Sequence, residues 1–301
     1  MEYKFIKAKA IENIHAGKAS ASTDSIDKPI QRDSSGIPCV ENTSFKGAIK
    51  QHFNHKSSTK VFVDAAFGAE GENGTPISVG QYSIKQLNLL SIPIIIHPVP
   101  EKMNSTVLVT SWEILDTLFE DICLYNPEDT KTKQFRNEYP EFRKSYVSGT
   151  APVVFSPESS EITIPTLTCI GKNYTLIQEG NTKTLPIWLE NVIFNEYDQN
   201  KVLIIVNSNT FRKLTNDFEL PLKHRNIIEW GESKNLWIEQ FLPRGTRFIS
   251  KVKMPEKLYR KKDNSEISKH KESFSSEVDK VCIQIGANKS VGYGECYFEI
   301  L

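Results

Sequence analysis

The sequence lacks the features that mark several classes of protein. Five cysteines stand far apart, their number is odd and no C-x-x-C pair occurs, so neither a disulfide framework nor a zinc knuckle is expected. No apolar run approaches the roughly 20 residues that a membrane-spanning helix needs, and the opening residues MEYKFIKAKA contain no apolar signal core. We therefore expect a soluble cytoplasmic protein with no membrane partner.

Net charge is also missing. The 301 residues include 37 Lys and Arg against 37 Asp and Glu. A protein that holds nucleic acid through a strong overall positive field is thereby excluded, although a groove with local positive charge is not. The sequence also lacks Walker A, H-E-x-x-H and G-x-S-x-G motifs and a G-x-G-x-x-G after a strand. These absences disfavour the common classes of small-molecule enzyme.

Hydrophobic periodicity predicts many strands and few helices. Residues 3–10 alternate as a strand does, and 61–65 and 185–197 also read as strands or hairpins. Residues 44–53 have helical spacing with Ser44 as cap, and 110–125 open with a T-x-x-E capping box. Strands interrupted by helices predict an α+β fold in one domain, residues 1–301, with an antiparallel sheet and a ferredoxin-like (RRM-like) core.

Two later segments carry their own signals. The turn Gly231-Glu232-Ser233-Lys234 lies between strand-like runs and predicts a β-hairpin, which we place at 224–245. Residues 254–279 are charged and poor in large apolar side chains, so a loop or mobile helix is expected there as an insertion.

The segment from Ser25 to Phe53 brings several chemical groups close together. Asp27 lies in a Pro-containing loop, and Ser44 and Lys46 open the predicted helix. Unpaired N–H groups at a helix start, with a lysine beside them, favour a phosphate site, which Lys50 one turn later would assist. The alternatives remain a solvated turn aspartate and a simple helix cap with an exposed lysine.

A second phosphate cradle is predicted near the other end, in QIGANKSVGYGE (284–295). Its glycines Gly286, Gly292 and Gly294 permit positive φ and close backbone approach, and Asn288 and Lys289 add donors. Two backbone-amide cradles without a nucleotide fingerprint suggest RNA. A glycine hairpin that merely joins two strands explains the same pattern.

Five stretches, taken in order, resemble the repeat-associated mysterious proteins (RAMPs) of type III CRISPR effectors, and more narrowly the repeated backbone subunit of the type III-B (Cmr) complex. They are IHAGKASAS…SIDKPIQRD (14–33), NTSFKGAIK (42–50), VLVTSWEILDTLF (107–119), HRNIIEWGESKNLWIEQFLPRGTRF (224–248) and QIGANKSVGYGECYF (284–298). The resemblance implies a ferredoxin-like RAMP palm with a projecting β-hairpin thumb.

The resemblance also implies a function. Family members bind CRISPR RNA along a groove and cut complementary single-stranded target RNA at regular intervals in antiviral defence. The implied partners are further copies of the same chain in a filament and other Cmr subunits, including the large polymerase/cyclase-like subunit and the small subunit. A scaffold subunit that holds the guide RNA without cutting remains the alternative.

Site residues follow from the same resemblance. The cut is attributed to an aspartate that matches Asp27, in the D-x-P context of Ile26 to Pro29. A carboxylate there would take a proton from the RNA 2′-OH or hold a divalent metal, Mg²⁺ or Mn²⁺. We also expect His15, Lys18 and Arg32 to contact RNA, His15 having the alternative of a hydrogen-bonded loop histidine.

In the thumb, three aromatic side chains are candidates to wedge between bases. Hairpin packing and contacts to the next subunit are the alternatives. These side chains are Trp230, Trp237 and Phe241.

Overall fold

The computed structural model describes residues 1–17, 26–55, 60–69, 78–96, 105–125, 128–146, 152–156, 166–169, 172–175, 183–199, 201–260 and 262–301. Within these ranges, no helix is both long and apolar enough to cross a membrane. The helices are α1 (Asn42–His55), α2 (Lys60–Phe67), α3 (Trp112–Tyr125), α4 (Thr130–Lys144), α5 (Ile187–Ile193), α6 (Ser208–Leu214) and α7 (His270–Val278), with a 3-10 turn at Lys289–Val291. The strands are β1 (Glu2–Ala10), β2 (Cys39–Val40), β3 (Ser83–Ile84), β4 (Leu87–Ile96), β5 (Thr106–Ser111), β6 (Val153–Ser156), β7 (Thr166–Cys169), β8 (Lys172–Thr175), β9 (Lys183–Thr184), β10 (Leu203–Val206), β11 (Leu222–Glu229), β12 (Glu232–Gln240), β13 (Arg247–Met254), β14 (Leu258–Tyr259), β15 (Glu266–Ile267), β16 (Val281–Gln284) and β17 (Glu295–Ile300).

One long sheet forms the centre of the molecule. Its strand order is β16-β17-β1-β13-β4-β5-β10-β6-β9. Most neighbours are antiparallel, but β10 runs parallel to β5 and β9 runs parallel to β6. Parallel neighbours require a crossover connection. The connection from β5 to β10 includes α3, α4 and α5, and the connection from β6 to β9 includes β7 and β8. The α+β prediction is confirmed, whereas the expectation of an antiparallel sheet is wrong because of these crossovers. The ferredoxin-like detail stays a prediction.

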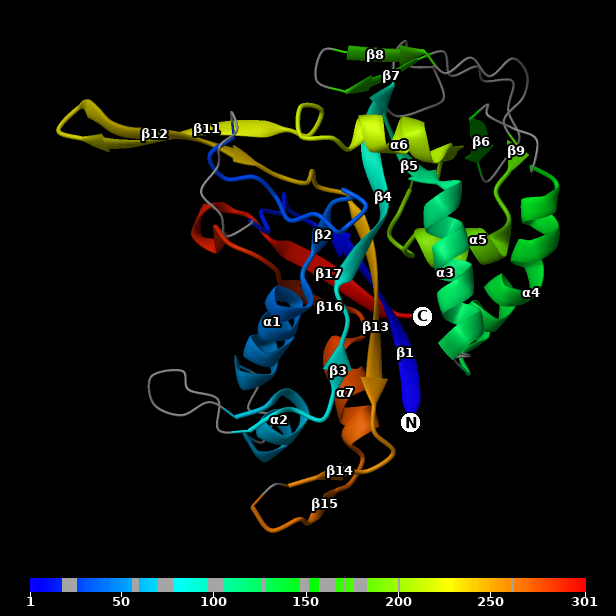
Figure 1. Ribbon diagram of the computed structural model, residues 1–301, viewed down its shortest axis with the longest axis vertical. Helices are drawn as coiled ribbons and strands as arrows, with labels where there is room; N and C mark the ends of the chain where they lie inside the picture. Colours follow the sequence, from blue (N-terminus) through cyan, green and yellow to red (C-terminus); the bar gives the residue numbers. More distant parts are fainter. Residues whose placement is uncertain are drawn as a thin grey trace.

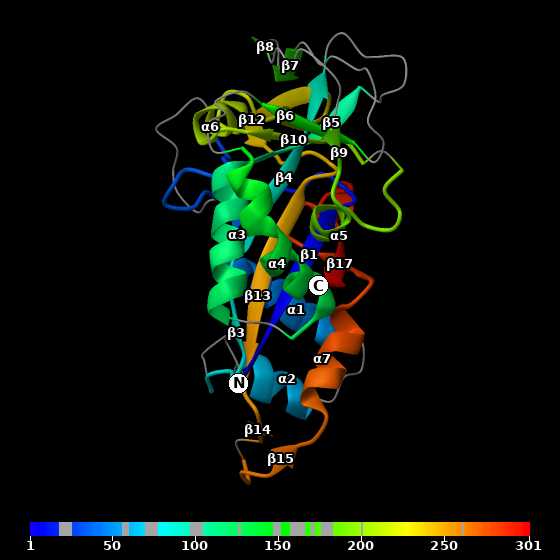
Figure 2. The ribbon, with the colours of Figure 1, turned by 90° about the vertical axis from the view of Figure 1, so that its right-hand side faces the viewer.

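Helices cover both faces of the sheet (Figures 1 and 2). β1 shows how the sequence builds this arrangement, because its side chains alternate between two cores. Phe5 packs with α3, α4 and α5, whereas Ile6, Ala8 and Ala10 pack on the other face with α1, α2 and α7. The sheet is therefore buried on both sides, and the loops at its edges are left to form surfaces.

Three local predictions fail because tertiary burial overrides short apolar patterns. Residues 61–65 belong to helix α2, and 185–197 contain helix α5 rather than strands. The predicted capping box is also wrong: Thr110 lies in β5, where its hydroxyl donates to the Leu90 carbonyl (2.7 Å). The first turn of α3 is capped instead by Ser111, whose hydroxyl accepts from the Ile114 amide (3.3 Å).

The predicted hairpin and insertion are both present as folded segments. β11 and β12 pair antiparallel from Leu222 to Gln240, slightly earlier than the predicted 224–245, and the hairpin projects from the body (Figure 1). Residues 254–279, expected to be a loop or mobile helix, contain β14, β15 and α7. Phe274 and Val278 of α7 lie fully buried in the main core, so this part of the insertion is packed against the sheet.

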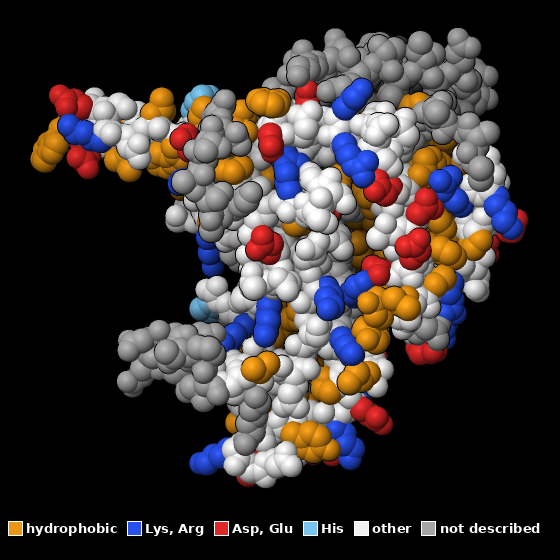
Figure 3. Space-filling view, viewed as in Figure 1, with side chains coloured by type: hydrophobic (Ala, Val, Ile, Leu, Met, Phe, Trp, Pro, Cys, Tyr) orange, Lys and Arg blue, Asp and Glu red, His pale blue; other side chains and the backbone are white. Residues whose placement is uncertain are grey.

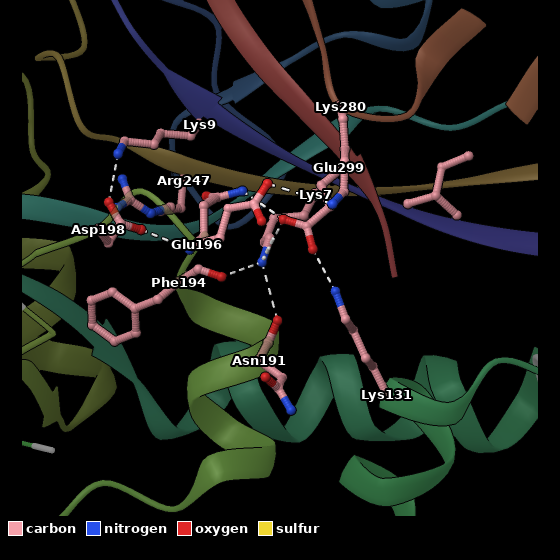
Figure 4. A network of polar contacts seen from close by, with 12 residues as sticks. Lys7, Lys9, Lys131, Asn191, Phe194, Glu196, Asp198, Arg247, Lys280 and Glu299 are labelled. Atoms are coloured by element: carbon pink, nitrogen blue, oxygen red, sulfur yellow. Dashed lines mark hydrogen bonds and ion pairs between the residues drawn. The ribbon is translucent and has the colours of Figure 1, made fainter. Parts of the chain in front are cut away.

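A network of buried charged side chains connects the sheet to helices α4 and α5 (Figure 4). The Lys7 ammonium of β1 is fully buried and donates to the carbonyls of Asn191 (3.1 Å) and Phe194, and it lies 3.4 Å from Glu299 of β17. Lys131 of α4 pairs with the same carboxylate. Burial lowers the pKa of Lys7 to about 8, and the nearby Glu299 carboxylate only partly opposes that effect.

Candidate nucleic-acid interface

The segment that carries Asp27 lies along the outer edge of β12, at the base of the hairpin. The Lys28 amide donates to the Ile238 carbonyl (3.0 Å), and the Gln240 amide donates to the Lys28 carbonyl (3.0 Å). Asp27 is exposed, and one oxygen of its carboxylate accepts from the Ile238 amide (2.7 Å). Asp27 is therefore held against a rigid strand while most of its side chain faces solvent.

The Glu239 carboxylate contacts side chains from three parts of the chain: the Asp27 segment, the hairpin and the glycine-rich loop. It pairs with Lys28 (3.2 Å) and Arg225, and accepts from the Trp237 indole N–H (2.8 Å) and the Asn288 amide side chain (3.1 Å). Glu239 itself is 2% exposed. Burial raises the pKa of this carboxyl, but the hydrogen bonds from Trp237, Lys28 and Arg225 outweigh burial, so the pKa is lowered and Glu239 is ionised.

The glycine-rich loop packs on the other side of the same site. Ala287 donates to the His15 carbonyl (3.0 Å), and Gly294 donates to the Asn13 carbonyl (2.8 Å). Gly286, Asn288, Gly292 and Gly294 all have positive φ, as the predicted cradle requires, and Lys289 is exposed. In Figure 1 this loop, the hairpin base and the start of α1 lie on the same side of the molecule.

His15 is buried, and its Nδ1 lies 2.7 Å from the Gln240 carbonyl. This geometry matches the hydrogen-bonded loop histidine that the sequence left open. A buried ring nitrogen bound to backbone serves to hold the 13–17 segment against β12, and direct contact of His15 with RNA stays a prediction.

The start of α1 is joined to the Asp27 segment by Gln31. Its side chain donates to the Ser44 hydroxyl (3.4 Å) and accepts from the Glu41 amide (2.8 Å). Helix α1 begins at Asn42, two residues before the predicted start, and has no acidic residue in its first turn. Lys46 and Lys50 are half-buried on this helix, and Lys46 forms no ion pair within the part of the chain that the structure describes. Lys46 thus places a positive charge near the start of α1, where the exposed Glu41 precedes the helix.

Arg32 is placed differently from the expectation. Its guanidinium pairs with Asp217 (2.8 Å) and donates to the carbonyls of Thr215 (2.7 Å) and Gly36 (2.7 Å). A phosphate would have to compete with all three partners, so Arg32 functions here as a tertiary anchor and its RNA contact stays a prediction. Lys18 lies outside the described residues.

The three thumb aromatics occupy three distinct environments. Trp230 at the hairpin tip is fully exposed with φ of 55°. Trp237 is half-buried under Lys28, whose ammonium lies 4.6 Å from the ring centroid, and Phe241 packs edge-on against Tyr293 with centroids 5.9 Å apart. Of these three aromatic side chains, Trp230 is the one that extends fully into solvent. Other apolar side chains along the hairpin are also exposed (Figure 3): Leu222, Ile227, Ile228 and Leu236.

The described residues contain no cluster of three or more His, Cys, Asp or Glu side chains arranged to hold a metal ion. Glu239, which is linked to the Asp27 segment through Lys28, is already paired with Lys28 and Arg225. Asp27 would therefore be the carboxylate that this segment offers to a divalent ion, and Mg²⁺ is commonly bound by one or two carboxylates together with substrate phosphates.

Sequence reasoning missed the two residues that assemble this site, Glu239 and Gln240. Gln240 accepts from the Ile30 amide (3.1 Å) and donates to the Asp217 carbonyl (2.9 Å). The alternation of side chains along the hairpin strands could have indicated Glu239. Arg225, Trp237 and Glu239 share one face of the hairpin, and a carboxylate near a cation on the same face favours an ion pair.

The chain resembles known proteins in sequence and in fold. No protein-family model matches the chain. The CRISPR system Cmr subunit Cmr4 of Saccharolobus solfataricus is 24% identical over 269 residues, covering 82% of this chain and 84% of that protein. A chain of the type III-B Cmr-beta complex in its apo state superimposes with a TM-score of 0.74 at 19% identity, over 100% of this chain and 97% of that one. This chain is similar to Cmr4 and shares the fold of the matched Cmr chain.

Two further solved structures share the fold. The Cmr-beta complex bound to cognate target RNA contains a chain that matches with a TM-score of 0.71 at 19% identity, again over 100% of this chain and 97% of that one. Oligomeric Cmr4 from Pyrococcus furiosus matches with a TM-score of 0.61 at 17% identity, over 100% of this chain and 98% of that one. Each of these matches covers the whole of this chain, so the similarity of fold extends beyond the central sheet to its hairpin.

Proposed function

We propose that this protein is a CRISPR RNA-binding backbone subunit of a type III-B effector complex and that it cleaves guide-complementary target RNA at Asp27. The observation that carries the proposal is the position of Asp27. It lies exposed at the base of the projecting hairpin. Its segment is linked to the glycine-rich loop through Glu239 and to the start of α1 through Gln31. The match to Cmr4 over 82% of the chain, and the match of the whole chain to one in a target-bound Cmr complex, support it.

The chemistry is that of RNA cleavage by its own 2′-OH. The carboxylate of Asp27 takes the 2′-OH proton and the 2′ oxygen attacks the adjacent phosphorus. The P–O5′ bond breaks as the 5′ oxygen gains a proton from water, which leaves a 2′,3′-cyclic phosphate. Holding the RNA so that the 2′ oxygen is in line with the leaving oxygen supplies much of the rate. A rigid hairpin base suits this task, because Asp27 is fixed by backbone pairing on both sides of Lys28.

A divalent ion, Mg²⁺ or Mn²⁺, is proposed as the cofactor. Asp27 would hold it together with the RNA phosphate, and when bound the ion would neutralise phosphate charge. The proposed partners are guide RNA, single-stranded target RNA, further copies of this chain, and other Cmr subunits, among them the large polymerase/cyclase-like and small subunits. The similar solved structures include a Cmr complex, a Cmr complex bound to target RNA and an oligomer of Cmr4, which supports this set.

Cleavage of a guide-complementary RNA by the assembled complex tests the proposal. Asp27→Asn keeps an oxygen that can accept from the Ile238 amide but removes the carboxylate, whereas Asp27→Ala removes both. Loss of a general base costs about 10²- to 10⁴-fold, so both variants are expected to lose regularly spaced cuts while target binding is kept. Omission of Mg²⁺ tests the metal in the same assay.

Asp263→Ala is the matched control, because Asp263 is an exposed aspartate that caps its own loop near β15. Normal cutting by Asp27→Asn would show that the carboxylate is not the reacting group. Normal cutting by both Asp27 variants would leave the chain as a guide-holding scaffold.

A further inference from the structure

Glu239 is a buried carboxylate that joins the three segments surrounding Asp27. Lys28 reaches it from the Asp27 segment, Arg225 from β11 and Asn288 from the glycine-rich loop. Its neighbour Trp237 donates to the same carboxylate and lies under the Lys28 ammonium. A single side chain of β12 thus fixes the distances between these segments.

If Glu239 were removed, hydrogen bonds to the backbone of β12 would be the remaining contacts that hold this face of the Asp27 segment. These are two hydrogen bonds around Lys28, and Asp27 itself adds one more to the Ile238 amide. On the opposite face, Gln240 accepts from the Ile30 amide. Strand alternation puts Glu239 and Gln240 on opposite faces of β12, so together they hold the segment from both sides.

The same contacts neutralise two cations beside the Asp27 segment. Lys28 is half-exposed, Arg225 is mostly buried, and both pair with Glu239. Their charges are therefore unavailable to phosphate while the pairs are intact. A group whose role is to hold the reacting segment in place would, on removal, slow the reaction without weakening RNA binding.

We propose that Glu239 is a positioning residue for RNA cleavage, holding the Asp27 segment through Lys28 against the hairpin and the glycine-rich loop. This inference rests on the proposed function of Asp27. Because displacement of a reacting group by about 1 Å can cost 10²-fold, Glu239→Gln slows target cleavage about 10- to 100-fold under saturating conditions. Binding of guide and target RNA is unchanged or tighter, since the substitution releases the charges of Lys28 and Arg225.

Single-turnover cleavage and target affinity are measured on the assembled complex with wild-type chain, Glu239→Gln, Lys28→Gln and the double variant. If Glu239 acts through Lys28, the double variant cuts no more slowly than the slower single variant. Glu232→Gln is the control, because it removes one carboxylate from the same hairpin at its exposed tip, where the described partner is Lys234. It leaves cleavage unchanged.

Unchanged cleavage by Glu239→Gln overturns the inference. A parallel loss of binding and cleavage, or multiplicative effects in the double variant, also overturns it, because either result shows a role that does not pass through the Asp27 segment. If Glu239→Gln does not assemble, Glu239→Asp replaces it, keeping the charge while shortening its reach, and an intermediate cleavage rate is expected. A wild-type complex that makes no cuts would refute the proposed function itself.

Discussion

The glycine-rich loop offers a matched pair of substitutions that separates backbone strain from lack of space. Gly286 and Gly292 have nearly the same φ, +75° and +78°. A Cβ on Gly292 would meet no atom within 4 Å. A Cβ on Gly286 would overlap the His15 carbonyl oxygen and lie 3.1 Å from its carbonyl carbon. Ala at either position therefore has the same conformational cost, and only Gly286→Ala adds a collision.

The magnitudes follow from these two contributions. A left-handed conformation costs an L-residue about 1–2 kcal/mol, which is the whole effect expected for Gly292→Ala. Overpacking against backbone that cannot swing away adds about 1–3 kcal/mol, so Gly286→Ala is expected to lower the free energy of unfolding by about 2–5 kcal/mol. The His15 carbonyl cannot move freely, because it accepts the Ala287 amide at 3.0 Å.

Urea unfolding of the purified chain measures both variants against wild type, and guide RNA binding is measured in parallel. Gly286→Ala is expected to weaken binding more than Gly292→Ala, because separation of the loop from the 13–17 segment also displaces Asn288 from Glu239. Equal destabilisation by the two substitutions would refute the reasoning, since it would mean that contact with the His15 carbonyl does not constrain the loop.

Two further predictions concern charged groups. The pKa of Lys7 falls from 10.5 in the unfolded chain to about 8 when folded, so the unfolded state binds more protons between these values and stability rises with pH across that window. The free energy of unfolding of wild type minus that of Lys7→Met should rise by about 3 kcal/mol from pH 7.5 to 10.5, as measured by urea denaturation; parallel curves would contradict it. Arg32→Ala should lower stability by about 1–2 kcal/mol because it loses bonds to Asp217 and Thr215, whereas Lys46→Ala should change stability by less than about 0.5 kcal/mol yet reduce the salt dependence of RNA binding, as a lost phosphate contact does. If Arg32→Ala instead reduced the salt dependence of RNA binding and Lys46→Ala instead lowered stability, the phosphate contact would lie at Arg32.

The sequence predicted those parts of the fold whose side-chain pattern is local. β1 alternates strictly between two cores, and the Gly231 turn specifies the hairpin β11–β12, so both were recognised. Helix α2 was missed because its apolar residues are not confined to one face of the helix. Phe62, Val63, Ala65 and Ala66 are all buried. A short segment buried all round has no periodicity that distinguishes helix from strand.

The candidate site divides in the same way. Asp27, the start of α1 and the glycine-rich loop were indicated by residue types that act through local backbone geometry, such as positive φ at Gly286. Arg32 and His15 were expected to contact RNA, but the structure gives each of them protein partners far away in the sequence, Asp217 and the Gln240 carbonyl. A local sequence pattern does not predict a hydrogen-bond partner that lies far away in the sequence.

The sequence by itself thus determined the α+β class and the position of the hairpin, and it indicated the resemblance and the aspartate on which the proposed chemistry depends. Only the tertiary structure decided that Lys28, Arg225 and Asn288 converge on Glu239. The physical reason is that propensity, turn type and periodicity are properties of neighbouring residues. Burial of a carboxylate among cations more than ten residues away depends on how the segments pack, and packing becomes visible only when the chain is folded.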